Sequence, residues 1–170
     1  MLYRFLSRIS FLWNSKNQHG VHSPFVFAYV TRCLYGKQRY SAHKTENILL
    51  KSIAYFKPEY VELLQGNPIL EEKINTVAPT VRLGTGNRSN CLIYMEQLTE
   101  ASLLYLIQKR GTKDSGTILI VQGPYGNKGH SSLWERLKQW EKVTVTVDMF
   151  HCAAVFFRPE QAKQHFKIRI

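Results

Sequence analysis

The sequence predicts an α/β protein in which helices flank a mostly parallel sheet that ends in an antiparallel hairpin. Three observations predict this class. From Tyr60 onward, short β-prone runs alternate with helix-like runs, as in a parallel sheet with helical crossovers. The run 117–122 (TILIVQ) is almost entirely apolar, as expected of a strand buried on both faces. Residues 143–150 and 153–158 are also strand-like, and the two-residue link between them permits only a hairpin.

The N-terminal segment is predicted to be helical. Apolar side chains at helical spacing form a stripe before the helix breaker Gly20: Leu2, Phe5, Leu6, Ile9, Leu12 and Trp13. Such a stripe usually docks on its own domain, and lying in a membrane interface is the alternative. Ser23 and Pro24 form a helix cap and first turn, so a second helix is expected over 25–35.

The rest of the chain is assigned in order of sequence. Strands are expected over 60–65, 80–85, 90–96 and 117–122, followed by the two strands of the hairpin. Helices are expected over 67–77, from Thr99 to about Arg110 with Gly111 ending it, and over 132–142. The glycine-rich segment 123–132 is interpreted as a strand-to-helix loop, with Ser131 or Ser132 as the cap of the next helix.

The net charge of +11 is concentrated at the N-terminus. Residues 1–45 contain no Asp or Glu but carry these bases: Arg4, Arg8, Lys16, Arg32, Lys37, Arg39 and Lys44. We therefore divide the chain into a basic helical segment, 1–45, packed on an α/β domain, 46–170. A basic segment of this kind can serve as a solvated surface, or it can bind nucleic acid or an anionic membrane.

Several functional classes are disfavoured. Cys33, Cys91 and Cys152 are odd in number, widely spaced and flanked by apolar residues, so we expect buried reduced thiols and no metal site. The longest strictly apolar run, 152–157, is too short to span a bilayer, and the N-terminus lacks the pattern of a secretory signal. We expect a cytoplasmic protein, with a membrane-peripheral location as the alternative.

Both ends of the chain resemble a known family. The segments His19 to Phe27 (HGVHSPFVF) and Lys142 to Ile170 are similar to the N-terminal and C-terminal signatures of Bacteroidetes-type class I S-adenosylmethionine-dependent methyltransferases. The resemblance implies a Rossmann-like sheet whose last strand inserts antiparallel. It also implies S-adenosylmethionine as the cofactor, if the protein has one. This chain is shorter than typical members in its middle, so we expect a sheet reduced by about one strand–helix unit.

The family's cofactor positions point to four candidate residues. After the first strand, where the family carries a glycine-rich loop, this chain keeps Glu62 and Gly66 and continues with Asn67 and Pro68. Glu96 follows a later strand at about the place of a family acid. Glu62, Gly66, Asn67 and Glu96 are thus the residual cofactor-binding candidates. Because Pro68 lacks an N–H and fixes φ, we expect the helix start to fill the cofactor's place. No catalytic residue can be assigned.

Three functions follow as hypotheses. The first is a methyltransferase-like protein with a degenerate cofactor site and little or no catalysis. The second is an active methyltransferase acting on an oxygen or nitrogen acceptor, since methyl transfer depends mainly on alignment of the reacting groups. The third is a peripheral module that binds nucleic acid or an anionic membrane through the basic N-terminus. Shortening the sheet also exposes an edge strand, which predicts a homodimer.

Overall fold

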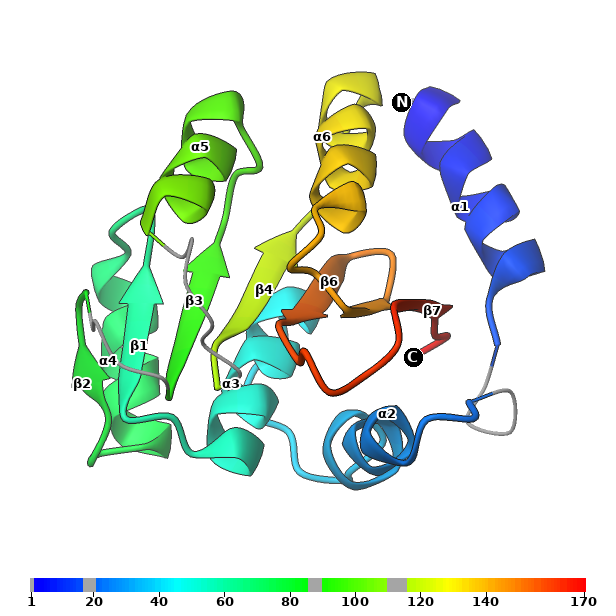
Figure 1. Ribbon diagram of the computed structural model, residues 1–170. Helices are drawn as coiled ribbons and strands as arrows, with labels where there is room; N and C mark the ends of the chain where they lie inside the picture. The colour runs from blue at the N-terminus through cyan, green and yellow to red at the C-terminus, as the bar shows by residue number, and fades with distance from the viewer. Residues whose placement is uncertain (1, 17–20, 86–89, 110–115) are drawn as a thin grey trace.

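The computed structural model describes residues 2–16, 21–85, 90–109 and 116–170 (Figure 1). The helices are α1 (Leu2–Asn14), α2 (Pro24–Ala28), the π-helical η2 (Tyr29–Leu34), α3 (Lys44–Phe56), α4 (Pro68–Val77), α5 (Glu100–Lys109) and α6 (Lys128–Gln139). The strands are β1 (Tyr60–Leu63), β2 (Arg82–Leu83), β3 (Cys91–Met95), β4 (Ile118–Gln122), β5 (Val145–Asp148), β6 (Cys152–Phe156) and β7 (Gln164–Lys167). The predicted helix ends at Gly20 and Gly111, like His19 of the family signature, lie outside the described residues.

The strands form one seven-stranded sheet in the order β2-β1-β3-β4-β6-β5-β7. Strand β6 is inserted antiparallel between β4 and β5, and the other neighbouring pairs are parallel. The carboxyl ends of β1, β3, β4 and β5 therefore meet at one edge of the sheet. The α/β class and the antiparallel hairpin predicted from the sequence are confirmed.

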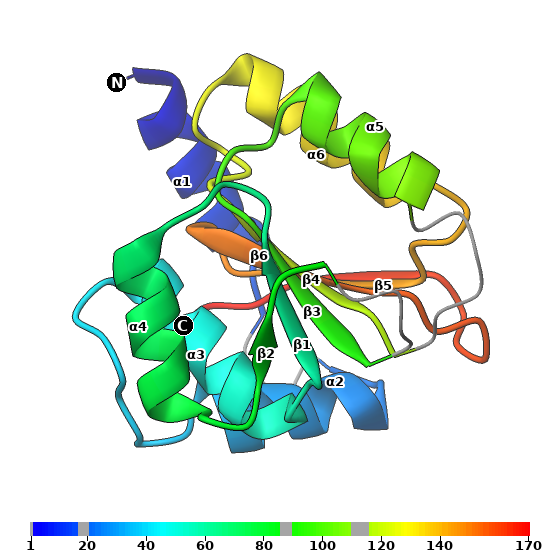
Figure 2. The same cartoon turned by 90° about the vertical axis from the view of Figure 1, so that its left-hand side faces the viewer.

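Helices cover both faces of the sheet, and each interface holds one part of the core. Figure 2 shows α5 and α6 on one face and α2, α3 and α4 on the other. Alternate residues of β3 and β4 serve the two sides: Leu92 and Ile120 pack toward α3 and α4, whereas Ile93 and Leu119 pack toward α5 and α6. This alternation is the two-residue period of a strand buried on both faces.

Side-chain caps fix where three helices begin. The Ser23 hydroxyl accepts the N–H of Val26 at 3.4 Å, and the Asn67 side chain accepts the N–H of Leu70 at 3.1 Å. The expectation that Ser131 or Ser132 caps α6 is wrong. The helix begins earlier, inside the glycine-rich segment, because Asn127 accepts the N–H of His130 at 2.9 Å.

Two elements were not predicted from the sequence. Helix α3 packs Leu49, Leu50 and Ile53 into the core with no exposed surface, directly before β1. Strand β7 pairs in parallel with β5, so the hairpin lies inside the sheet and the chain does not end with it. The edge strands are β2 and β7, and the homodimer through an exposed edge stays a prediction, as does the division of the chain at residue 45.

The expected docking of the α1 stripe on the domain is wrong. Phe11 is the buried residue of α1, and its ring contacts those of Tyr125 and Phe150. The six residues of the apolar stripe are exposed instead, with exposed fractions from 41% for Leu12 to 87% for Trp13.

Candidate functional site

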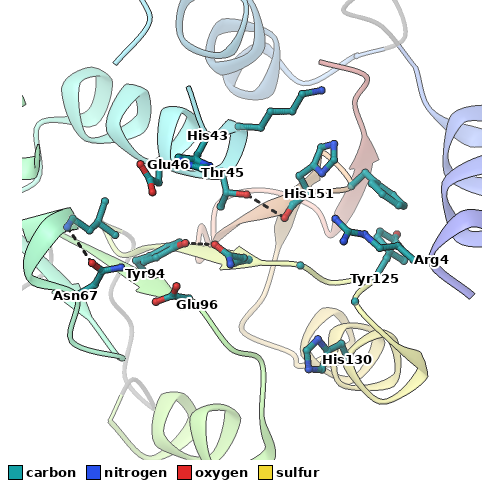
Figure 3. Close-up of a pocket in the computed structure, with 16 residues that line it drawn as sticks. Arg4, His43, Thr45, Glu46, Asn67, Tyr94, Glu96, Tyr125, His130 and His151 are labelled. Carbon is teal, nitrogen blue, oxygen red and sulfur yellow. Dashed lines mark hydrogen bonds between the residues drawn. The ribbon is translucent and has the colours of Figure 1, made fainter. Parts of the chain in front are cut away.

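A cavity of about 490 Å³ lies at the carboxyl ends of β3 and β4, beside the start of α4 and the β5–β6 turn (Figure 3). Its volume falls in the usual range for small-molecule sites, about 300–1,000 Å³. In open α/β sheets this edge is where ligands bind. The residues that line it are Arg4, His43, Lys44, Thr45, Glu46, Asn67, Leu70, Tyr94, Glu96, Gln122, Gly123, Tyr125, Gly126, His130, Phe150 and His151.

Helix N-termini supply much of the wall. Helices α3, α4 and α6 each present first-turn or capping residues to the cavity or its rim: His43 to Glu46, Asn67, and His130. The side chains of Asn67 and Asn127 occupy the N-termini of α4 and α6, whereas α3 has no side-chain cap. A helix N-terminus carries a partial positive charge from its unpaired N–H groups, so these walls favour an anion.

Hydrogen bonds hold the floor of the cavity in place. The Tyr94 hydroxyl donates to the side-chain oxygen of Gln122, which joins the ends of the neighbouring strands β3 and β4. The Gln65 side-chain oxygen accepts the backbone N–H of Glu96 at 2.9 Å, which ties the turn after β1 to the end of β3. Figure 3 shows the Tyr94 side chain beside Asn67, with the dashed line of its hydrogen bond at the end away from that residue.

The cavity is electropositive on the side of α1 and α3. Burial lowers the pKa of His151, and the nearby cations Lys44, Arg4 and Arg8 lower it further. Of the two carboxylates in the lining, Glu46 is paired with Lys73 at 2.6 Å, and this hydrogen bond is the main reason that its pKa is lowered. The pairing leaves Glu96 as the lining acid for which the described residues show no ion pair.

The four predicted cofactor residues do not come together. Two of them, Asn67 and Glu96, line the cavity beside Tyr94 (Figure 3). Asn67 is engaged in capping α4. Gly66 does not line the cavity, but a Cβ added at this position would meet nothing within 4 Å. The expectation that the Asn67–Pro68 helix start fills the space is therefore wrong, because open volume lies beside it.

Glu62 lies on the other side of β1. It is 4% exposed and accepts a hydrogen bond from the Tyr105 hydroxyl of α5. A second hollow, of about 470 Å³, lies beside it and is lined also by Gln65, Gly84, Thr85 and Tyr105. The described end of β2, residues 82–85, carries no carboxylate. A ribose-binding acid of the kind found in dinucleotide sites is thus missing from this strand end.

These features suit the carboxylate of S-adenosylmethionine but not its cationic sulfonium and ammonium groups. The cavity presents Arg4 and Lys44 to such a ligand, and Glu62 is held away from it by Tyr105. Among the described residues, no group of three or more His, Cys, Asp or Glu side chains could hold a metal ion. The chemistry that the cavity does offer is proton exchange at the imidazole of His151, and binding of anionic groups.

The sequence did not reveal that the cavity would also be lined by Arg4, by His43 to Thr45 and by His151. They reach one cavity from α1, from the start of α3 and from the hairpin turn, which are far apart along the chain. The signal that could have revealed α3 is the run Ile48–Leu49–Leu50 with Ile53, preceded by Glu46 in the first turn.

Comparisons of the chain with protein-family models, with curated proteins and with solved structures gave no match. Within the described ranges, none of the helices has the length and apolar character needed to cross a bilayer.

Proposed function

We propose that this protein is a methyltransferase-like protein with a degenerate cofactor site, which binds a small molecule at the strand ends and catalyses little or no methyl transfer. The strand order supports the family part of the proposal. It resembles the class I methyltransferase arrangement in having an antiparallel strand inserted next to the last parallel one, although it lacks one outer strand beyond β2 and has β7 in addition at the other edge. The missing unit agrees with the shortened middle of the chain.

The main observation in favour of a degenerate cofactor site is the placement of Glu62. As the acid of the first strand, Glu62 would have to bind a ligand at the strand ends. Instead, it is buried against α5 and accepts a hydrogen bond from Tyr105. The turn that follows is tied to β3 through Gln65, and Asn67 caps α4. Glu62, Gln65 and Asn67 are therefore engaged in the fold, and the described end of β2 carries no carboxylate, which leaves Glu96 as the candidate acid that faces the cavity.

The electrostatics of the cavity favour an anionic ligand. Arg4, Lys44 and the uncapped N-terminus of α3 all direct positive charge into it. Arg4 and Lys44 are also among the cations that lower the pKa of His151. A small molecule with a carboxylate or phosphate group would meet complementary charge there, and its hydrogen bonds would be strengthened by that charge.

An active methyltransferase is the second candidate, and the open volume is the observation that favours it. The cavity is large enough for a cofactor, and Glu96 with Asn67 lines it at the end of β3 and the start of α4. Under this alternative these two residues would hold the ligand.

Calorimetric titration with S-adenosylmethionine separates the two candidates. We expect no saturable heat up to about millimolar ligand, because Glu62 is engaged with Tyr105 and the cavity presents Arg4 and Lys44 to a cationic ligand. Binding with a dissociation constant in the low micromolar range, lost in Glu96→Gln and kept in the exposed-site control Glu72→Gln, would establish the active enzyme instead.

A further inference from the structure

Helix α1 is attached to the protein by the narrow face that carries Phe11. Phe11 is its buried residue and contacts Phe150 and Tyr125, with ring centroids 5.5 and 6.1 Å apart. Ser7 and Tyr3, one and two turns earlier on the same face, are half-buried. The end of the helix is fixed by Lys16, whose backbone N–H donates to the carbonyl oxygen of Lys167 at 2.8 Å. Figure 1 shows α1 at the rim of the molecule, beyond α6 and β7.

The opposite face of α1 is apolar and open to solvent. The exposed fractions are 71% for Leu2, 62% for Phe5, 54% for Leu6, 46% for Ile9, 41% for Leu12 and 87% for Trp13. At about 100° per residue these side chains span an arc of roughly 120°. A helix on a globular domain normally turns such a face toward the core. Here the orientation is reversed, and a continuous apolar stripe of this kind marks an interaction surface.

The charged residues beside the stripe indicate which kind of partner binds it. Arg4 and Arg8 are exposed on one flank, and exposed Lys16 follows the helix. No Asp or Glu occurs before Glu46 in the sequence. An apolar stripe bordered by Arg, with a Trp at one end, is typical of a helix that lies in the headgroup region of an anionic bilayer. The Trp13 ring, with its apolar body and polar N–H, suits that boundary.

We propose that α1 is a membrane-interface helix that binds the surface of an anionic lipid bilayer through Leu2, Phe5, Leu6, Ile9, Leu12 and Trp13. The helix lies on the bilayer and does not cross it, since its 13 residues are too few to span one. A second copy of the chain is a poorer occupant, because pairing two α1 helices would bring Arg4 and Arg8 close to their own copies with no acid on the helix to pair them. Nucleic acid would leave the apolar stripe in water.

The experiment is co-sedimentation with vesicles, combined with tryptophan fluorescence. Vesicles of phosphatidylcholine with about 30% phosphatidylglycerol are expected to bind the protein, and pure phosphatidylcholine to bind it several-fold more weakly, as each basic side chain near the surface adds to the attraction. Of the three tryptophans, Trp134 is fully buried, Trp140 is partly buried and Trp13 is 87% exposed, so a blue shift of the emission on binding reports mainly on Trp13. The shift should be lost in Trp13→Phe while binding remains.

Matched variants test the face itself. Leu6→Glu with Ile9→Glu should lower the vesicle partition coefficient on the order of a hundredfold, since each buried aliphatic side chain contributes about tenfold. Ile69→Glu with Leu104→Glu, at exposed apolar sites of α4 and α5, is the control and should leave it unchanged. Arg8→Gln should weaken binding to the anionic vesicles several-fold and change binding to neutral ones little.

Three outcomes would overturn the proposal. The wild-type protein could stay in the supernatant with no shift of its emission. Vesicle binding could be lost in the control variant, Ile69→Glu with Leu104→Glu, to the same extent as in Leu6→Glu with Ile9→Glu. The wild-type protein could also form a dimer that Leu6→Glu with Ile9→Glu dissociates while no vesicle binding occurs, in which case the stripe is an interface between copies. Circular dichroism of each variant shows whether the fold is retained, and the wild-type fluorescence result stands without any variant.

Discussion

Replacing Phe156 with alanine is expected to lower the free energy of unfolding by about 3–5 kcal/mol. Phe156 ends the inserted strand β6, is 2% exposed, and packs edge-on against Phe25 and Tyr29 at 4.9 and 5.5 Å between ring centroids. The substitution therefore opens a cavity where α2, η2 and α3 meet the sheet. Urea denaturation followed by circular dichroism measures the effect.

The matched control for this prediction is Phe27→Ala. Phe27 lies on α2 but is 44% exposed, so its truncation should lower the free energy of unfolding by no more than about 1 kcal/mol. If Phe156→Ala cost as little as Phe27→Ala, the inserted position of β6 in the core would be refuted.

The second large effect concerns the buried carboxylate of Asp148, which is 3% exposed. It accepts hydrogen bonds from the Tyr125 hydroxyl and from the N–H of Phe150, the latter at 2.9 Å. Burial raises the pKa of Asp148, and these two hydrogen bonds oppose the rise. Tyr125→Phe keeps the ring stacked on Phe150 and removes one donor, so it should lower the free energy of unfolding by about 1–3 kcal/mol.

The pH dependence of this deficit follows from the direction of the pKa shift. A carboxyl group with a raised folded-state pKa binds its proton more tightly in the folded protein, so stability is lost as the pH rises through that pKa. Removing the Tyr125 donor raises the pKa of Asp148 further, because the hydrogen bond favours the charged form. The deficit should therefore be larger at about pH 7.5 than at about pH 4.5.

Urea denaturation at both pH values measures the deficit, with Asp148→Asn as the background control. In that background the carboxyl group is gone, so Tyr125→Phe should cost the same at each pH. An equal deficit of Tyr125→Phe at both pH values in the otherwise unchanged protein would contradict this account of the buried carboxylate.

The parts of the fold that could be predicted are those with a strong local pattern. The apolar run of β4 and the short link around His151 specified a buried strand and a hairpin. Helix α3 was missed although its apolar run is strong, since His43 gives it no side-chain cap to mark its start. Strand β7 (QHFK) is polar and is half-buried at most, so what holds it is its backbone pairing with β5, which no local pattern reveals.

The site was less predictable than the fold. Helical periodicity indicated which residues of α1 share a face, but not that Phe11, outside the stripe, would be the residue that docks. The cavity combines Arg4, Lys44 and His151 with the strand ends, and only the tertiary structure brings these residues together. The family resemblance placed Glu62 and Glu96 near one ligand, although Glu62 lies inside β1 and Glu96 follows β3. Whether a side chain faces the cavity or a helix depends on the strand's pleat and on partners such as Tyr105.

The central claim is that the strand-end cavity no longer holds S-adenosylmethionine, and locating any bound ligand tests it most directly. The measurement is the ¹H–¹⁵N correlation spectrum of labelled protein as S-adenosylhomocysteine is added, which assigns an effect to its residues where a heat signal cannot. We predict that the amide signals of Gly66 and Glu96 stay in place up to about millimolar ligand. Saturable movement of both signals in the low micromolar range would contradict the account and show that the cofactor site is intact.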